Sequence, residues 1–387
     1  MRPKDAANRW PLAPGGQSPL VVSWWLFVFI GSMSISIFSH QFLSGKFSYD
    51  AATIREYMAM RDLWVGLSLD SWVNTARVLT FVFGLLSEAL ALPLYYALVL
   101  LLSVRVLDVF NVDKVQYHLL AGTWLLCGAL FFWQPSKELV ALPVALFLSL
   151  ARTPLMRLAA TVVFLGYAVL FRQYWAICYF YFVFSLISLR LHVAGRSRLA
   201  LILFLLAFMV PFMAAQLAGQ PPLTEARMMV NEWRVDSPDA RSAFSNSLEN
   251  SGMWTDAANT VLAWLYMNIP LAMLLNPTPH YVLFALLQLT TLVFFSAACV
   301  NYVKQARRLH DPGTTYPRCI AFVVAYSLTL ALFEPDFGSF LRHEIIMVIP
   351  LLIVVFGLAH SGRGAAIVDN DLRAVFCGVS RPPITVN

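Results

Sequence analysis

The sequence predicts an all-α, polytopic integral membrane protein, and three observations support this class. Hydrophobic residues make up 59% of the 387 positions and charged residues only 12%, whereas soluble domains carry about 25% charged residues. Apolar runs long enough to cross about 30 Å of hydrocarbon recur along the whole chain. Lys and Arg gather in the short segments between these runs, where they orient helices in a membrane.

Ten apolar runs are predicted to span the membrane, with both termini on the cytoplasmic side. An eleventh stretch, 259–275, is interrupted by Pro270. If it crossed, the basic segment 304–318 would move to the outer side, against the positive-inside rule. We therefore expect 259–275 to be a re-entrant or interfacial helix. The predicted spans are 20–39, 78–103, 116–133, 139–151, 158–171, 173–190, 199–218, 281–303, 319–333 and 344–360.

These spans define one transmembrane domain, 20–360, which leaves no room for a large soluble domain. The N-terminal tail, 1–19, and the C-terminal tail, 361–387, are expected in the cytoplasm. Two sizeable segments, about 40–71 and 219–280, are expected on the outer, periplasmic face of the membrane.

The sequence lacks the motifs of several well-known enzyme classes and the residue spacing of metal sites. The sequence contains no P-loop, GxSxG, HExxH or strand-linked GxGxxG motif. No acidic pair has the spacing of a divalent-metal site, so we expect no metal and no cofactor. The net charge of +6 is explained by helix orientation, and we expect no nucleic-acid partner. Neither a zinc site nor a disulfide framework is expected, because no two cysteines have CxxC spacing. The cysteines are Cys127, Cys178, Cys299, Cys319 and Cys377.

The first candidate motif is Ser136-Lys137-Glu138, in the gap between two predicted spans. Pro135 ends the first span, and Ser136 is expected to cap the next helix. One interpretation is a capped hairpin with a lysine at the membrane interface. The other is that Lys137 and Glu138 face a cavity, because ionisable groups at membrane depth are functional candidates by default.

Two further motifs place arginines on the outer face, where the positive-inside rule disfavours them. Arg172 joins two spans with almost no loop; it either reaches up to the surface or binds phosphate, for which the planar guanidinium is suited. Arg342 and His343 are expected to open the last span after a turn that contains Glu334. His343 can serve as acid or base near neutral pH, and a plain polar turn is the alternative.

Three fixed cations, Lys137, Arg172 and Arg342, therefore fall at the outer mouth of the predicted bundle. Such a grouping indicates a site for an anionic, phosphate-bearing ligand. Asp50 follows the first span and is either an ordinary loop aspartate or part of this site.

Other residues near the outer face carry weaker signals. Glu88 lies in the second predicted span, where it pairs with an arginine or lines a cavity. Residues 72–83 are expected to form an interfacial helix leading into that span. Tyr174, Trp175 and Trp133 are candidates for stacking on sugar rings, with an aromatic interface belt as the alternative.

These motifs, in this order, resemble bacterial polysaccharide polymerases of the Wzy and EpsG-like type. Those proteins belong to the O-antigen ligase and polymerase superfamily and are related in architecture to GT-C glycosyltransferases. The resemblance covers most of the membrane region, but the late outer segment 219–280 is modest beside the very large loop that many members carry. The matching motifs are Tyr49-Asp50, Ser136-Lys137-Glu138, Arg172 before a Tyr/Trp-rich span, and Arg342-His343.

The resemblance implies a glycosyltransferase of the bacterial inner membrane that makes O-antigen or exopolysaccharide. It would transfer a growing glycan from an undecaprenyl-diphosphate carrier to another lipid-linked repeat unit, without metal, at the periplasmic face. Its partners would be that lipid-linked oligosaccharide, membrane lipid and a chain-length regulator protein.

The residues can be assigned roles on this basis. Lys137, Arg172 and Arg342 would hold the diphosphate and stabilise the leaving group. The acceptor proton would go to one of four groups, in the order of preference His343, Glu138, Asp50, Glu334.

Two other functions remain open at this point. One is a GT-C-type transferase of single sugars from a polyprenyl-phosphate donor, in which Asp50 would matter most. The other is a transporter or flippase of an anionic lipid-linked substrate. The scarcity of ionisable residues in the middle of the predicted spans counts against transport.

Overall fold

Helices form nearly all of the described chain. A computed structural model describes residues 19–42, 49–60, 68–109, 115–232, 243–275, 279–309 and 315–359. Apart from Pro19, the predicted tails 1–19 and 361–387 lie outside the described residues, as does Cys377. The described residues contain no strand, only one isolated bridge between Ala243 and Asp336. The all-α class predicted from the sequence is confirmed.

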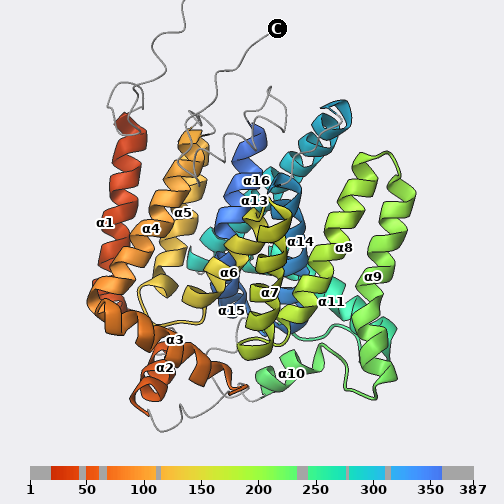
Figure 1. The fold of residues 1–387 in the computed structure, drawn as a ribbon, viewed down its shortest axis with the longest axis horizontal. Coiled ribbons are helices and arrows are strands. Elements are labelled where there is room, and N and C mark those ends of the chain that lie inside the picture. The colour runs from red at the N-terminus through yellow and green to blue at the C-terminus, as the bar shows by residue number, and fades with distance from the viewer. Residues whose placement is uncertain are drawn as a thin grey trace, which may run out of the picture.

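The helices cluster into one bundle (Figure 1). Eight helical segments in the described residues are long and apolar enough to cross a membrane, which makes this a multi-pass membrane protein. The predicted total of ten spans and the cytoplasmic position of the termini remain predictions. The helices are α1 (Pro19–Phe42), α2 (Tyr49–Ala59), α3 (Ser71–Leu85), α4 (Glu88–Val109), α5 (Val115–Phe132), α6 (Glu138–Leu150), α7 (Pro154–Leu170), α8 (Trp175–Val193), α9 (Ser197–Leu217), α10 (Glu225–Glu232), α11 (Met253–Asn268), α12 (Leu271–Leu274), α13 (Pro279–Leu309), α14 (Thr315–Phe333), α15 (Phe337–Glu344) and α16 (Val348–Ala359).

The centre of the bundle is occupied by α14 and by the α15–α16 segment, which are buried along most of their length. The sequence of α16 is apolar on every side, as expected of a helix surrounded by other helices. By contrast, α9 exposes large apolar side chains, including Leu201, Leu205 and Leu206. Such an exposed apolar face is suited to contact with lipid.

Two predicted spans have different boundaries in the structure. The run 78–103 is broken at Leu86 and Ser87, so that α3 and α4 are separate helices. Asp70 begins α3 by accepting a hydrogen bond from the Trp72 amide at 2.7 Å, and α3 therefore contains the expected interfacial segment 72–83. Glu88 is consequently the first residue of α4 and of the candidate span Glu88–Leu107, at its end and not deep inside it.

The last span also begins earlier than predicted. Asp336 caps α15 by accepting from the Ser339 amide at 2.8 Å. Arg342 and His343 therefore lie in the last turn of a helix and do not open one. The expected cap at Ser136 is wrong as well, because its hydroxyl donates to the Phe131 carbonyl at 3.1 Å and leaves α6 without a side-chain cap.

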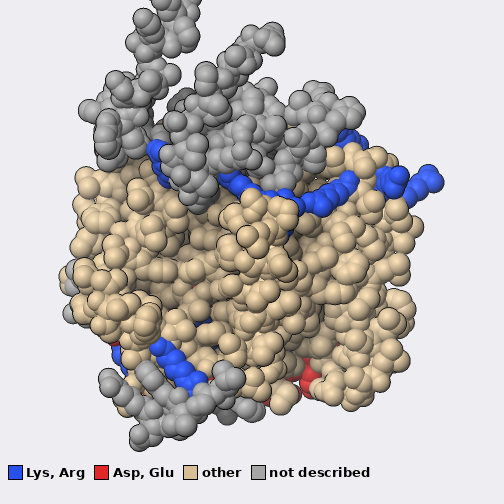
Figure 2. Space-filling view, viewed as in Figure 1, with Lys and Arg blue, Asp and Glu red and all other residues tan. Residues whose placement is uncertain are grey.

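The two ends of the bundle differ in charge. One end contains the α8–α9 turn and the end of α13, where Arg307 donates to the His192 carbonyl at 2.8 Å. Exposed basic residues gather there, and Figure 2 shows Lys and Arg in a band along the upper part of the molecule. The opposite end carries α2, α3 and α10 (Figure 1). The exposed residues of the basic end include Arg190, Arg196, Arg198, Lys304 and Arg307.

The segment predicted not to cross, 259–275, enters the bundle from the end opposite to the basic one. The Met253 amide, at the start of α11, donates to Gln216 Oε1 near the end of α9 at 3.3 Å. The following long helix, α13, also starts toward this end, since Phe284 packs against Phe337 with ring centroids 6.0 Å apart. The length and composition of Met253–Leu274 would allow it to span a membrane, and its re-entrant course remains a prediction.

Close packing between α1 and α5 depends on Gly122. A methyl group added there would lie 2.7 Å from Val28 Cγ2 and would also clash with the Trp24 ring. Small residues of this kind let transmembrane helices approach each other. A methyl group on Gly166 of α7 would meet nothing within 4 Å.

We expect Gly122→Ala to lower the free energy of unfolding by about 1–3 kcal/mol through overpacking. Gly166→Ala is the matched control, because it gains the same helix propensity, up to about 1 kcal/mol, without a clash. The measurement is unfolding of the purified protein in mixed detergent micelles. Equal stability of the two variants would contradict the close approach of α1 and α5.

Candidate functional site

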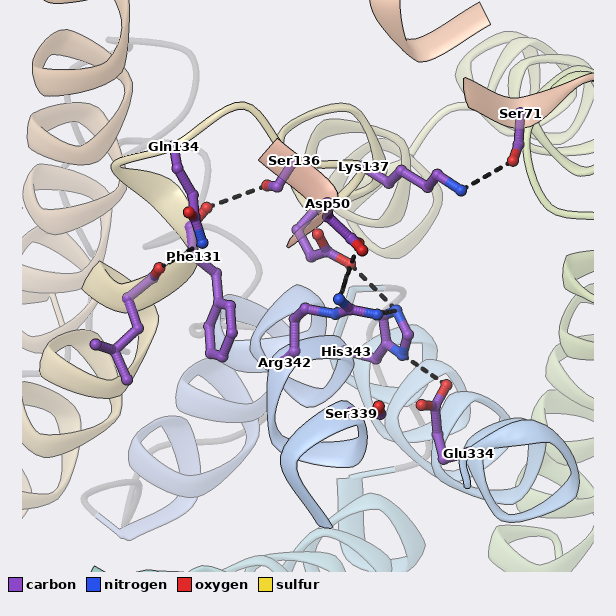
Figure 3. A network of polar contacts seen from close by, with 12 residues as sticks. Asp50, Ser71, Phe131, Gln134, Ser136, Lys137, Glu334, Ser339, Arg342 and His343 are labelled. Atoms are coloured by element: carbon purple, nitrogen blue, oxygen red, sulfur yellow. Dashed lines mark hydrogen bonds and ion pairs between the residues drawn. The ribbon is translucent and has the colours of Figure 1, made fainter. Parts of the chain in front are cut away.

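Seven charged or titratable side chains from four parts of the chain meet at the end of the bundle opposite the basic one. Figure 3 shows part of this group, with Arg342 facing Asp50 and His343 facing Glu334. We call the set the ionic cluster. All of these residues were candidates from the sequence, and the structure brings the three motifs together. Its members are Asp50 from α2, Lys137 and Glu138 from the start of α6, Arg172 from the α7–α8 turn, and Glu334, Arg342 and His343 from the α14–α15 segment.

Glu138 lies at the centre of the ionic cluster and is fully buried. Its Oε1 atom is 2.8 Å from Arg172 Nη2, 3.2 Å from His343 Nε2 and 3.7 Å from Arg342 Nε. Because Glu138 is the first residue of α6, the positive end of the helix dipole also favours its negative charge. A single carboxylate therefore links three helix junctions.

Arg172 is held inside the protein rather than at its surface. The α7–α8 turn is tight, with the Trp175 amide donating to the Arg172 carbonyl at 2.9 Å. The Arg172 guanidinium contacts Glu138 and also donates to the Tyr174 hydroxyl at 3.1 Å. Only 7% of the Arg172 surface is exposed, and its charged partner is the buried carboxylate of Glu138.

Arg342 and Asp50 form the most accessible ion pair of the ionic cluster. Arg342 Nη1 lies 2.8 Å from Asp50 Oδ2, and the two side chains are 24% and 17% exposed. This pair joins α2 to α15 across 292 positions of sequence. A ligand reaching the cluster from outside would meet these two groups before Glu138.

His343 bridges two carboxylates. Its Nδ1 atom is 2.6 Å from Glu334 Oε1, and its Nε2 atom is 3.2 Å from Glu138 Oε1. The Nε2 atom also lies 3.4 Å from Arg342 Nη2. His343 therefore connects both carboxylates with Arg342 inside the ionic cluster.

Lys137 differs from both arginines. Its ammonium donates to Ser71 Oγ at 2.9 Å and lies 3.3 Å from the centroid of the Trp72 ring. Within the described residues, no carboxylate forms an ion pair with it. Burial, reinforced by the charge of Arg172, lowers the pKa of Lys137 to about 8. Lys137 is thus the cation most available to an incoming anion.

Some proton-transfer candidates are less accessible than the sequence-based order assumes. Both nitrogens of His343 are occupied by carboxylates, and Glu138 and Glu334 are 0% and 3% exposed. Asp50, third in that order, is the carboxylate of the ionic cluster that a substrate can reach most easily.

The prediction that Trp175 stacks on sugars is wrong for this structure. Its side chain is fully buried, and its ring packs against Tyr167 and Tyr326 at centroid distances of 4.5 and 5.4 Å. Tyr174 stacks on Phe333 at 5.0 Å, which occupies one of its faces.

Trp133 lies to one side of the ionic cluster, at the end of α5. It packs against Tyr96 at 5.4 Å and lines a half-open pocket of about 340 Å³. Glu88 lines this pocket and also pairs with Arg55 at 2.6 Å, so the structure agrees with both interpretations of Glu88.

The outer segment after α9 is fastened to the turn that carries Glu334. The Phe244 amide donates to the Pro335 carbonyl at 2.7 Å, and the Phe244 and Phe337 rings are 4.4 Å apart. Arg227 of α10 is fully buried and donates to the Ala331 carbonyl at 2.8 Å. Sequence reasoning missed Arg227 and Phe244, because neither lies in a short gap between spans.

Known proteins provide no closer description of this site. Comparison of the chain with protein-family models, with curated proteins and with solved structures finds no match. Among the described residues, no group of three or more His, Cys, Asp or Glu has an arrangement that could hold a metal ion.

We expect Glu138→Ala to destabilise the protein by about 3–5 kcal/mol, because it leaves Arg172 buried and unpaired. Glu88→Ala is the matched control. It breaks an ion pair whose side chains are 43% and 34% exposed, and such pairs contribute about 0–1 kcal/mol. Unfolding in mixed micelles measures both changes. A similar small loss in both variants would show that Glu138 does not hold the ionic cluster together.

Anion binding is expected to weaken as the pH rises through about 8, the lowered pKa of Lys137. Below this pH its ammonium is charged, and above it the charge is lost while both arginines stay charged. The measurement is the affinity for a polyprenyl diphosphate in detergent, from about pH 7 to about pH 9.5. Lys137→Arg keeps its charge over this range and should remove most of the decline. The same decline in both proteins would contradict a role for Lys137.

Proposed function

We propose that the ionic cluster is the active site of a membrane glycosyltransferase that polymerises lipid-linked oligosaccharide repeat units. The donor would be a glycan on undecaprenyl diphosphate, and the acceptor another lipid-linked repeat unit. One observation carries the proposal: Lys137 before α6, Arg172 in the α7–α8 turn and Arg342 in the last turn of α15 lie around a common carboxylate at one end of the bundle. Cations with adjacent acid and imidazole groups are suited to a diphosphate leaving group.

Donor binding is assigned to Lys137 and Arg342. Lys137 has no carboxylate partner among the described residues, and Arg342 is partly exposed. The guanidinium of Arg342 can exchange Asp50 for a phosphate oxygen, since phosphate and carboxylate bind the same fork of N–H groups. Arg172 is a positioning residue in this scheme, because it orients Glu138.

Replacement of Asp50 by phosphate at Arg342 would also free a general base for the reaction. Once phosphate takes its place, the Asp50 carboxylate is free to accept the proton of the acceptor hydroxyl. The hydroxyl oxygen forms a bond to the anomeric carbon, and the bond from that carbon to the diphosphate oxygen breaks. The undecaprenyl diphosphate leaves with the electron pair, and Lys137 and Arg342 offset its added charge.

The proposed orientation in the membrane rests on the distribution of basic residues between the two ends of the bundle. The end of the bundle opposite the ionic cluster carries a band of exposed basic residues, which the positive-inside rule assigns to the cytoplasm. We therefore propose the bacterial inner membrane with the ionic cluster facing the periplasm. A chain-length regulator protein is the proposed protein partner.

Arg342→Ala is expected to abolish long-chain polysaccharide while the protein remains in the membrane. The matched control is Arg55→Ala. It removes an arginine that is not a member of the ionic cluster and that pairs with Glu88 at 2.6 Å. Gels of lipid-linked and surface glycans from cells carrying each variant measure chain length. Accumulated single repeat units with Arg342→Ala, and a normal ladder with Arg55→Ala, are the expected results. A normal ladder with Arg342→Ala overturns the proposed function.

The exposure of Asp50 favours one second candidate, a GT-C-type transferase of single sugars from a polyprenyl-phosphate donor. This carboxylate is the most accessible acid of the ionic cluster and belongs to the first outer segment. Asp50→Asn in the same cells separates the two functions. A ladder with unchanged chain lengths but altered sugar composition supports the single-sugar transferase. Loss of the ladder supports the polymerase.

A further inference from the structure

A second polar group lies inside the bundle, apart from the ionic cluster. It consists of Asn268 at the end of α11, Gln288 of α13 and Glu344 at the end of α15. Gln288 Nε2 donates to Glu344 Oε1 at 2.9 Å and lies 3.5 Å from Asn268 Oδ1. Their exposed fractions are 7%, 2% and 1%, respectively. Nothing in the proposed glycosyl transfer uses these residues.

Glu344 has no positive partner. Within the described residues, no Lys, Arg or His forms an ion pair with its carboxyl group. The two preceding residues point elsewhere: Arg342 contacts Asp50, and His343 contacts Glu334. An ionised carboxyl that is buried without a cation is costly, and neutralisation by a proton is the usual solution.

One hydrogen-bond donor is missing among the groups around Glu344. Its Oε2 atom and the Oε1 atom of Gln288 are both buried without a hydrogen-bond partner. Asn268 cannot supply the donor, because its amide nitrogen donates to the Trp264 carbonyl at 2.8 Å and lies 3.4 Å from Ser327 Oγ. A proton on the carboxyl of Glu344 adds the missing O–H group.

The surrounding backbone also favours a positive occupant. Helix α11 ends at Asn268, and Ile269 and Pro270 separate it from α12. The C-terminal end of a helix carries a partial negative charge. Interrupted helices inside membranes often frame sites for protons or small cations. The titratable group that faces Glu344 from another helix is the Cys127 thiol of α5, which brings no positive charge.

We propose that Glu344, together with Gln288 and Asn268, is a proton-binding site in the interior of the bundle. The carboxyl group of Glu344 holds its proton at neutral pH and releases it only at higher pH. The site belongs to the same helix as His343 but is separate from the ionic cluster. It stands independently of the proposed function, since it rests on the burial and hydrogen bonds of these three residues alone.

Infrared spectroscopy of the full-length protein in lipid tests the site directly. The spectrum of Glu344→Gln is subtracted from that of the unaltered protein at neutral pH. The expected difference contains the C=O band of a protonated carboxyl group, which is lost on raising the pH. Glu88→Gln is the control for an exposed, ion-paired glutamate, and its difference should contain carboxylate bands only. A carboxylate signal from Glu344 at neutral pH overturns the proposal.

A chemical probe on the unaltered chain covers the case in which Glu344→Gln does not fold. Dicyclohexylcarbodiimide adds across its C=N bond to a protonated buried carboxyl and rearranges to a stable N-acylurea, without any leaving group. Mass spectrometry should find this adduct at Glu344, with ion-paired Glu138 unlabelled and with less adduct at higher pH. No infrared band and no adduct at Glu344 would refute the site. Loss of the adduct or the infrared band on adding Na⁺ at fixed pH would overturn the proton as occupant in favour of a sodium ion.

Discussion

The buried carboxylate of Glu138 is the interaction on which the end of the bundle depends. It has no contact with water, so its charge must be compensated by neighbouring cations. Arg172 and Arg342 do so at 2.8 and 3.7 Å, and each is supplied by a different helix junction. The ends of α6, α7 and α15 are therefore tied to one point, and displacement of any of them would leave a buried charge unpaired.

This constraint divides the ionic cluster into two functional layers. The inner layer, which includes Glu138, Arg172 and Glu334, is almost completely buried and holds the geometry. The outer layer consists of Lys137 and the Arg342–Asp50 pair, which retain access from outside. Preorganised buried groups that support a few exposed ones are typical of sites that bind or transfer charged groups. In our proposed mechanism, the outer layer touches substrate and the inner layer keeps its charges in position.

The central helices are nearly all apolar, and the polar exceptions therefore have specific consequences. Polar groups buried in such an interior need hydrogen-bond partners there. The ionic cluster meets this need largely with opposite charges, although Glu138 Oε2 and Arg342 Nε also lack a hydrogen-bond partner. The group around Glu344 meets it only in part, because two of its oxygen atoms lack donors. The two sites thus represent different solutions to burial, one by ion pairing and one, in our proposal, by protonation.

The sequence by itself determined the helical membrane class and the location of the candidate residues. Those properties are local: apolar runs identify helices, and cations in gaps of a few residues must lie near helix ends. Packing alone decided that Asp50 meets Arg342 across 292 positions, and that Trp175 is buried while Asp50 is accessible. A helical pattern does not specify which neighbour each face meets. Likewise, no local signal marked Glu344 and Gln288 as partners, because their contact exists only after α13 and α15 have packed together.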